Sequence, residues 1–250
     1  MLNLDAYFSR INYDGPREPT RKALFALHRA HLFTVPFENL DIHMGRPIVL
    51  GEENHFEKIV NEHRGGFCFE NNGLFAGILR QMGFTVTMME ARVLPSIGGS
   101  GIRFGHLALM VEVDGRWLAD VGFGEAFIEP LRLDFPAAQV QAGNRAFRVQ
   151  HDGTIGTYAM KDGKWYDQYE FRFAPRQLSD FSEGCHFHQT SPLSSFTQKK
   201  MCSIATPHGR KTISQDRFIV TEDGARHERP IVDDADYHAL LREHFGVTLG

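Results

Sequence analysis

The sequence predicts an α+β protein, because the spacing of its apolar residues changes twice along the chain. Up to about residue 83, apolar residues recur with the period of a helix. From Phe84 they alternate as in strands, and Asp-Gly pairs at 114–115, 152–153 and 162–163 mark hairpin turns. The last section mixes strand patterns with a closing helix. Helices followed by strands and a mixed tail are typical of α+β folds.

Two helices in the first section can be placed by their ends and their apolar faces. Thr20 is suited to an N-cap, and the helix that follows it stops before Pro36. One side of this helix carries Leu24, Leu27, His28 and His31. A second helix begins near Cys68 and ends at Gly83. Its apolar face recurs at helical spacing and consists of Phe75, Ile78, Leu79 and Met82.

The middle section, roughly residues 84–185, is predicted to be an antiparallel sheet or barrel built from hairpins. Its first strand patterns cover residues 85–88, 106–113 and 117–121. The last section adds a loop at 190–192, strands at 203–206 and 217–221, and a helix from about 234 to 244. We find no internal repeat that would indicate a solenoid.

The composition is that of an ordinary globular protein, and it excludes several partners. Of the 250 residues, 42% are hydrophobic and 23% charged, and the formal net charge is −4. This charge predicts no binding to nucleic acid or to an anionic membrane, and no apolar run is long enough to span a bilayer. The segment 1–5 does not resemble a secretory signal. An odd count of three cysteines argues against disulfides, so we expect a cytoplasmic location.

The run from Arg64 to Asn71 is the strongest indication of chemistry. Cys68 follows Gly65 and Gly66 and stands at the start of the second helix. Unpaired backbone N–H groups at a helix N-terminus favour a thiolate, which is the form of cysteine that attacks carbonyl carbon. We expect the two glycines to leave room for a substrate at the sulfur. The alternative is a buried structural cysteine.

A cysteine nucleophile needs a base, and the base needs a group that orients it. His106 opens an apolar strand after a glycine-rich loop, and Asp120 ends the next strand. A pair on one face requires a three-residue loop, a bulge or a frayed strand end, because a strict two-residue loop at 114–115 would point the two side chains to opposite faces. We predict one of these irregularities.

The chain resembles the arylamine N-acetyltransferase family of prokaryotic type in several segments of matching order. The first two are Arg10–Tyr13, similar to an Arg-x-x-Tyr motif, and Val35–Leu40, similar to a Pro-Phe-Glu-Asn motif. The others are Arg64–Cys68 at the nucleophile, Asp120–Gly124 at the acid, and the C-terminal pieces Ser191–Pro192 with Phe196 and Thr206–Arg210.

The resemblance implies a catalytic triad of Cys68, His106 and Asp120. It implies a papain- or transglutaminase-like core, made of a helical bundle at 1–83 and an antiparallel β-barrel at 84–189, with an α/β lid at 190–250. It also implies ping-pong transfer from acetyl-CoA, through an acetyl-cysteine, to an arylamine, a hydrazine or an N-hydroxyarylamine. Acetyl-CoA is then a co-substrate, and no permanently bound cofactor is expected.

Other residues are assigned to supporting roles. Near the motifs lie aromatic residues that could form a slot for an aromatic ring, or simply part of the core: Phe37, Phe123, Phe127 and Phe196. The loop before His106 could hold CoA phosphates, or be a plain connection, and its candidates are Gly98, Gly99, Ser100 and Arg103. The resemblance suggests an ion pair of Glu38 with Arg64 that fixes the nucleophile loop, joined by Arg10.

Three alternatives remain open from the sequence. The same triad would serve an amide synthase or an acyltransferase for longer acyl-CoA donors. It would also serve a cysteine hydrolase of papain or transglutaminase type, and the third alternative is a binding module without catalysis. We predict no metal site at Cys185–His188, because no second pair of ligands has suitable spacing.

Overall fold

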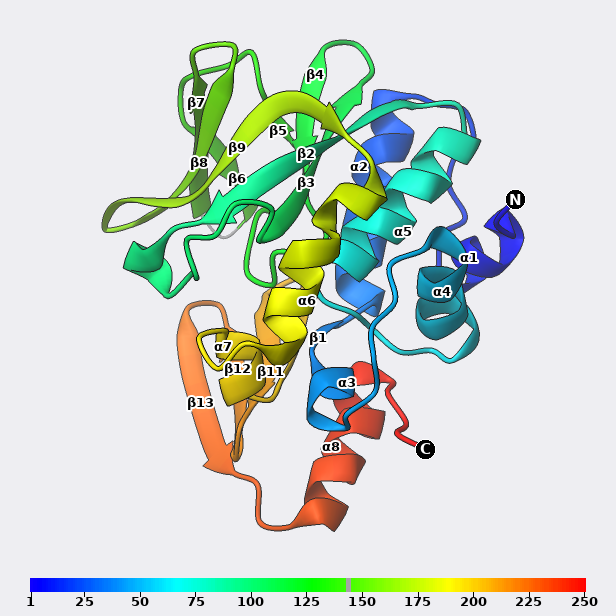
Figure 1. The fold of residues 1–250 in the computed structure, drawn as a ribbon, viewed down its shortest axis with the longest axis vertical. Helices are drawn as coiled ribbons and strands as arrows, with labels where there is room; N and C mark the ends of the chain where they lie inside the picture. The colour runs from blue at the N-terminus through cyan, green and yellow to red at the C-terminus, as the bar shows by residue number, and fades with distance from the viewer. Residues whose placement is uncertain (143–144) are drawn as a thin grey trace.

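The computed structural model describes residues 1–142 and 145–250 and shows two antiparallel sheets joined by helices (Figure 1). The N-terminal part is helical, as the sequence predicts, and its elements are α1 (Leu4–Arg10), α2 (Arg21–Thr34), α3 (Leu40–His43), α4 (Glu52–Phe56), the π-helical turn η1 (Glu57–Asn61) and α5 (Cys68–Gln81). Thr20 caps α2, because its side chain accepts a hydrogen bond from the N–H of Ala23 (3.2 Å). The helix α5 ends next to Gly83, whose φ of 92° suits glycine.

The larger sheet has eight strands in the order β5-β4-β3-β2-β9-β8-β7-β6 and curls into a nearly closed barrel (Figure 1). The side chain of Gln139, in one edge strand, bonds to both backbone groups of Arg132 in the other, at 2.7 and 3.0 Å. The two edges of the sheet are thereby joined. The strands are β2 (Thr85–Val93), β3 (His106–Glu112), β4 (Arg116–Ala119), β5 (Leu131–Arg132), β6 (Gln139–Gln141), β7 (Arg145–His151), β8 (Ile155–Asp162) and β9 (Lys164–Arg176).

The connection between β3 and β4 is a three-residue loop. Glu112 pairs with Arg116, so residues 113–115 form the turn, and Asp114 and Gly115 take positive φ values of 49° and 119°. In this register His106 and Asp120 belong to the same face of the sheet. The prediction of one of three irregularities is therefore confirmed, and the irregularity is the three-residue loop.

The smaller sheet, which we call the C-terminal sheet, has five strands in the order β1-β10-β11-β12-β13. The apolar side of helix α8 (Asp234–Phe245) packs on one face of it, against Cys202, Ile213 and Phe218. Its first strand comes from the N-terminal part of the chain and was not predicted. The strands are β1 (Phe37–Glu38), β10 (Met201–Thr206), β11 (Gly209–Ser214), β12 (Arg217–Glu222) and β13 (Ala225–Pro230).

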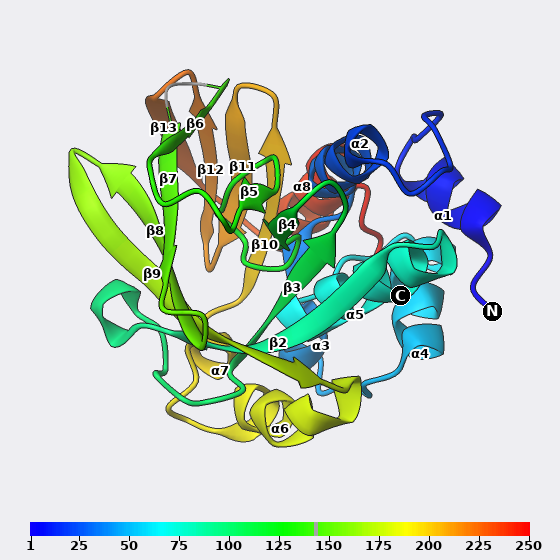
Figure 2. The ribbon, with the colours of Figure 1, turned by 90° about the horizontal axis from the view of Figure 1, so that it is seen from above.

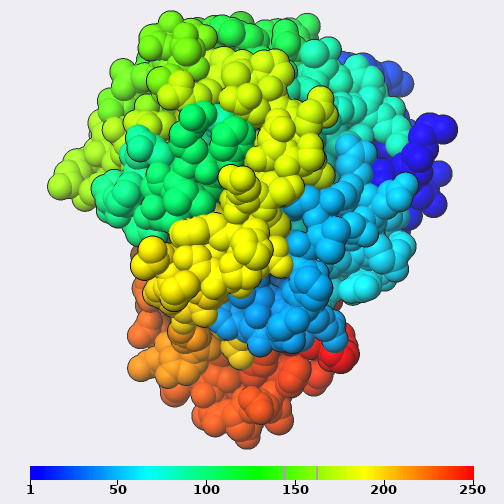
Figure 3. All heavy atoms as spheres, viewed as in Figure 1, coloured from blue at the N-terminus to red at the C-terminus, as the bar shows by residue number. Residues whose placement is uncertain are grey.

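Helical segments connect the barrel to the C-terminal sheet, where the sequence predicted mainly a loop. In the view from above, α5 lies beside β2 and β3, while β7 and β8 lie farther from it (Figure 2). The atoms of α6, in yellow, lie between the green barrel and the blue segment before α4 (Figure 3). None of the helices in the described part of the chain combines the length and apolar character needed to cross a bilayer. The connecting elements are η4 (Leu178–Phe181), α6 (Ser182–Thr190) and α7 (Ser195–Gln198), whereas the turn η2 (Pro95–Ile97) lies between the barrel strands β2 and β3.

Candidate active site

Cys68 is the first residue of α5, and its side chain is buried, with 3% of its surface exposed. The helix begins here because the Glu70 carboxylate accepts a hydrogen bond from the N–H of Phe67 (3.1 Å). The sulfur lies 4.0 Å from the carbonyl oxygen of Gly105, the residue directly before His106. The predicted nucleophile thus contacts the start of the strand that carries the predicted base.

His106 and Asp120 form a buried hydrogen-bonded pair. The Nε2–H of His106 donates to Oδ2 of Asp120 (2.7 Å), and both side chains are at most 2% exposed. This bond leaves Nδ1 as the ring nitrogen that can take a proton. The pair has the geometry that general base catalysis requires of a histidine and its orienting carboxylate.

Two side chains that the sequence analysis missed hold the acid in place. The amide of Asn72 donates to Oδ1 of Asp120 (2.8 Å) and accepts from the N–H of Val121 (2.8 Å). His28 in α2 accepts from the N–H of Asp120 (3.1 Å) and donates to the carbonyl of Ile128 (2.8 Å). Burial lowers the pKa of His28 to about 4, so it stays neutral in this role.

The charges of the triad depend on one another. Burial opposes ionisation of Asp120, but contact with His106 and hydrogen bonds from Asn72 and Gly122 keep its pKa below the usual value. Burial, and then the negative charge of Asp120, raise the pKa of Cys68, although backbone bonds from Leu107 and Phe69 lower it. The helix N-terminus alone therefore does not explain a thiolate here. A thiolate at Cys68 therefore needs a further group that takes its proton.

The glycines of the nucleophile motif serve internal packing, which corrects the expectation that they leave room for a substrate. A Cβ at Gly65 would lie 2.0 Å from the carbonyl oxygen of Pro36, and one at Gly66 would lie 2.6 Å from Cβ of Glu70. Gly122 is required in the same way, since its Cβ would lie 2.7 Å from the Cα of Cys68. The acid loop therefore lies directly against the nucleophile.

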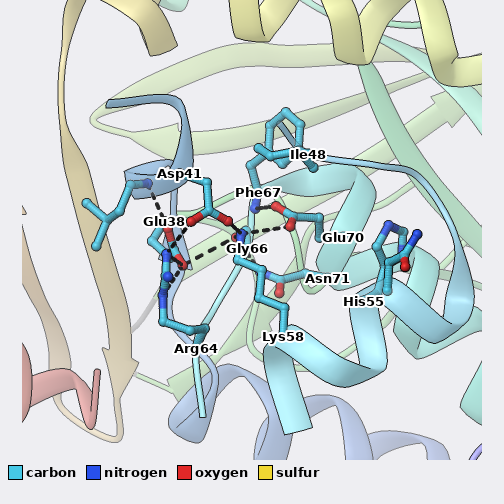
Figure 4. A network of polar contacts seen from close by, with 12 residues as sticks. Glu38, Asp41, Ile48, His55, Lys58, Arg64, Gly66, Phe67, Glu70 and Asn71 are labelled. Atoms are coloured by element: carbon cyan, nitrogen blue, oxygen red, sulfur yellow. Dashed lines mark hydrogen bonds and ion pairs between the residues drawn. The ribbon is translucent and has the colours of Figure 1, made fainter. Parts of the chain in front are cut away.

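A buried network of charges, which we call the ion cluster, reaches the first turn of α5 at Glu70 (Figure 4). Arg64 contacts Glu38 (2.8 Å) and Asp41 (3.0 Å). Lys58 contacts Asp41 (2.6 Å) and Glu70 (2.7 Å). The expected pair of Glu38 with Arg64 is present, and Asp41, Lys58 and Glu70 extend it beyond what the sequence predicts. Three carboxylates share two cations, and burial raises the pKa of Glu70 although Lys58 counteracts this shift.

Arg10 does not join this cluster through its charge, contrary to the expectation. Its guanidinium donates to the carbonyl oxygens of Ile59 (2.8 Å), Thr34 (2.9 Å) and Arg64 (3.1 Å). It therefore supports the backbone of the segment that leads to Cys68. Burial lowers the pKa of Arg10 to about 10.

The four predicted aromatic residues fall into two groups. The rings of Phe37 and Phe196 lie 5.9 Å apart, and the ring of Phe123 packs edge-on against His106 at 5.3 Å. Phe127 differs, because it is fully buried in the barrel core and stacks on His28 at 5.7 Å. The structure thus places Phe123 against His106, and Phe127 behind Asp120 through His28. Phe37 and Phe196 lie together, with Phe196 against Phe67, the residue before Cys68 (5.9 Å).

The four residues proposed to bind phosphate differ in exposure and in contacts. Gly98 and Ser100 are exposed, while the backbone of Gly99 packs on Val93. Arg103 pairs with the buried Glu90 (2.5 Å) and lines a cavity of about 150 Å³ on the barrel surface. Glu90 also pairs with Arg172 (3.4 Å) and Arg176 (3.0 Å), so three guanidinium groups share this one carboxylate.

His188 in α6 is a further buried histidine that the sequence analysis considered only as a metal ligand. Its Nε2–H donates to the carbonyl oxygen of Gly105 (2.9 Å), and its Nδ1 accepts from the hydroxyl of Ser194 (3.1 Å). It therefore holds the same carbonyl that contacts the sulfur of Cys68. Among the described residues, no group of three or more possible ligands is placed to hold a metal ion.

The fold and the site together are those of a papain-like cysteine enzyme, a class that includes both hydrolases and acyltransferases. A family model described as N-acetyltransferase matches residues 21–250. The arylamine N-acetyltransferase of Escherichia coli is 34% identical over 98% of this chain and 88% of its own length. The arylamine N-acetyltransferase from Salmonella typhimurium has a solved structure that superposes with a TM-score of 0.92 at 33% identity, covering 99% of this chain and 92% of that one.

The chain therefore belongs to the arylamine N-acetyltransferase family, and it is an acyltransferase. A solved member of the family from Mycobacterium marinum, described in complex with CoA, has a TM-score of 0.89 at 30% identity. The match covers 98% of this chain and 93% of the Mycobacterium marinum chain.

Proposed function

We propose that this chain transfers an acetyl group from acetyl-CoA to an arylamine or arylhydrazine nitrogen, or to the oxygen of an N-hydroxyarylamine, through Cys68. The observation that carries the proposal is the buried bond between His106 and Asp120 (2.7 Å), placed beside a cysteine at a helix start. Membership of the family supports the choice of donor and acceptor.

In the first half-reaction, Nδ1 of His106 takes the proton of Cys68 while the sulfur attacks the thioester carbonyl of acetyl-CoA. Backbone N–H groups near Cys68 stabilise the oxyanion of the tetrahedral intermediate. The intermediate collapses by breaking the bond to the CoA sulfur, which leaves with the proton from His106. The acetyl group remains on Cys68 as a thioester.

In the second half-reaction, the neutral amine attacks the acetyl carbonyl and gives its proton to His106. The bond to the Cys68 sulfur breaks, the amide leaves, and the proton returns to the sulfur. A thioester must be protected from water, and the burial of Cys68 and His106, at 3% and 2% exposure, provides this protection.

The experiment that tests this proposal is mass spectrometry after brief exposure to acetyl-CoA without an amine. We expect one added acetyl group that maps to Cys68, and its loss when an arylamine is added. Cys68→Ala should show no adduct and lose at least about 10⁴-fold in transfer. Cys202→Ala is the matched control, since Cys202 is buried beside α8 in the C-terminal sheet.

Three outcomes would contradict the proposal. Full transfer by Cys68→Ala would exclude the covalent route. Release of free acetate in place of acetylated amine would indicate a hydrolase. A clear preference for propionyl- or malonyl-CoA over acetyl-CoA would assign the chain to a different acyl donor.

A further inference from the structure

Arg210 in β11 is a charged residue that the mechanism above does not use. Its Cα partner in β10 is Ala205, so it shares a face of the C-terminal sheet with Ser203 and Thr212. The neighbouring residue pair Cys202 and Ile213 faces the other way and packs against α8. Arg210 therefore lies on the face of the sheet that is turned away from α8.

The contacts of Arg210 lead toward the active site. Its Nη1 donates to the hydroxyl of Ser203 (2.9 Å), and Ser203 is the strand partner of Phe37. Phe37 in turn forms an isolated β-bridge with Gly66 in the nucleophile loop. Its ring also lies next to Gly124 in the acid loop, because a Cβ built at Gly124 would lie 3.8 Å from that ring. The guanidinium is thus bonded to the strand partner of Phe37, the aromatic residue that contacts both the nucleophile loop and the acid loop.

The charge of Arg210 lacks a full partner. Arg210 is mostly buried, and among residues 1–142 and 145–250 no carboxylate forms an ion pair with it. Glu125 acts on it only at longer range and is paired with Arg145 (3.4 Å). One carboxylate therefore serves two guanidinium groups. An incompletely paired buried charge is costly, so a binding role explains its presence better than a stabilising one.

We propose that Arg210 binds an oxyanion of a substrate, with the hydroxyls of Ser203 and Thr212 beside it. The inference rests on the proposed function, which supplies two sources of this chemistry. One is a phosphate of acetyl-CoA, and the other is a carboxylate on the aromatic acceptor. A planar guanidinium can bind either group through two parallel hydrogen bonds.

The donor arm of the test compares acetyl-CoA with p-nitrophenyl acetate, an acetyl donor without phosphate, using the neutral acceptor 4-aminobenzamide. If a phosphate is bound, Arg210→Met should raise the KM for acetyl-CoA about tenfold or more, because it removes a charge-assisted hydrogen bond. The kinetics with p-nitrophenyl acetate should not change. Arg210→Lys should recover part of the loss, since it keeps the charge without the planar fork.

The acceptor arm compares 4-aminobenzoate with 4-aminobenzamide, using p-nitrophenyl acetate as the donor in both. If a carboxylate is bound, Arg210→Met should lower kcat/KM for 4-aminobenzoate about tenfold and leave the amide unaffected. The matched control is Arg217→Met, which removes the same charge from the same face of the sheet at a side chain that is 49% exposed. This control should change neither arm.

Thermal unfolding separates a binding role from a structural one. Because its charge is not fully paired, replacing Arg210 by Met should leave Tm unchanged or raise it. Equal losses with all four substrates together with a lower Tm would overturn the inference, and so would unchanged kinetics in both arms. The proposed function fails separately, if the unmodified protein forms no acetyl-Cys68 with p-nitrophenyl acetate.

Discussion

The two sides of the first turn of α5 carry buried charges of different kinds. Glu70 reaches into the ion cluster, where Lys58 and Arg64 neutralise carboxylates with permanent cations. Two residues further on, Asn72 reaches to Asp120, whose main partner is a histidine. A permanent cation fixes a carboxylate in place, whereas a partner that can lose its charge leaves the carboxylate available for proton transfer. In the mechanism that we propose, one side therefore holds the nucleophile in place and the other makes it reactive.

The largest expected effect is the loss of the acid on the reactive side. Asp120→Asn removes the charge that stabilises the imidazolium of His106, and kcat/KM should fall roughly 10³- to 10⁴-fold. Steady-state kinetics with one donor and one acceptor will measure this loss. The control is Asp134→Asn, which removes a carboxylate that pairs with Arg116 on the barrel surface. Activity of Asp120→Asn close to that of the control would remove the distinction between the two sides.

On the other side, Lys58→Met should mainly affect stability. It leaves three buried carboxylates with one cation, and the free energy of unfolding should fall by about 3–5 kcal/mol. Denaturant unfolding measures this change. The double variant Lys58→Met with Glu70→Gln removes one charge of each sign and should recover part of the loss. A variant of Lys58 that unfolds like the natural protein, but transfers acetyl far more slowly, would reverse the assignment of roles.

A smaller effect is expected from His28, the neutral histidine behind Asp120. Its pKa falls from 6.5 to about 4 on folding, so the unfolded chain takes up this proton at a higher pH than the folded protein. Below pH 6.5 the free energy of unfolding should therefore decrease by about 1.4 kcal/mol per pH unit for this group, down to about pH 4. Above pH 6.5 His28 is neutral in both the folded and the unfolded state, so it adds no further pH dependence to the free energy of unfolding.

Unfolding of His28→Gln at several pH values tests this assignment. The pH dependence between 6.5 and 4 should become shallower by that amount, although His31 and His55, whose pKa values are each lowered to about 3, retain their own contributions. An identical slope in both proteins would show that His28 is not the group that titrates. It would also remove the support for a neutral ring on the reactive side.

The sequence alone located much of this site, because local signals mark Cys68, His106 and Asp120. The hairpin register could also be predicted, since side chains alternate with a strict period of two. The partners Asn72 and Lys58 were missed, because their contacts depend on tertiary packing. The one sequence signal for Asn72 was a polar side chain near the start of a helix that is otherwise expected to be buried.

The fold was also predicted unevenly, for physical reasons. Strand β13 is exposed along its whole length, so it lacks the alternation that identifies a strand. Strand β1 has only two residues and forms by pairing with β10, across a long separation in the chain. By contrast, α5 and α8 combine clear apolar faces with clear ends, and both lie where the pattern indicated.

The length of the turn at residues 113–115 has a consequence for how this protein can vary. Deleting or inserting one residue there would keep both strands but invert every side chain of β4 relative to β3, moving the carboxylate to the outside. A change of two residues would preserve the orientation. We expect natural and engineered variants of this hairpin to differ in length by even steps.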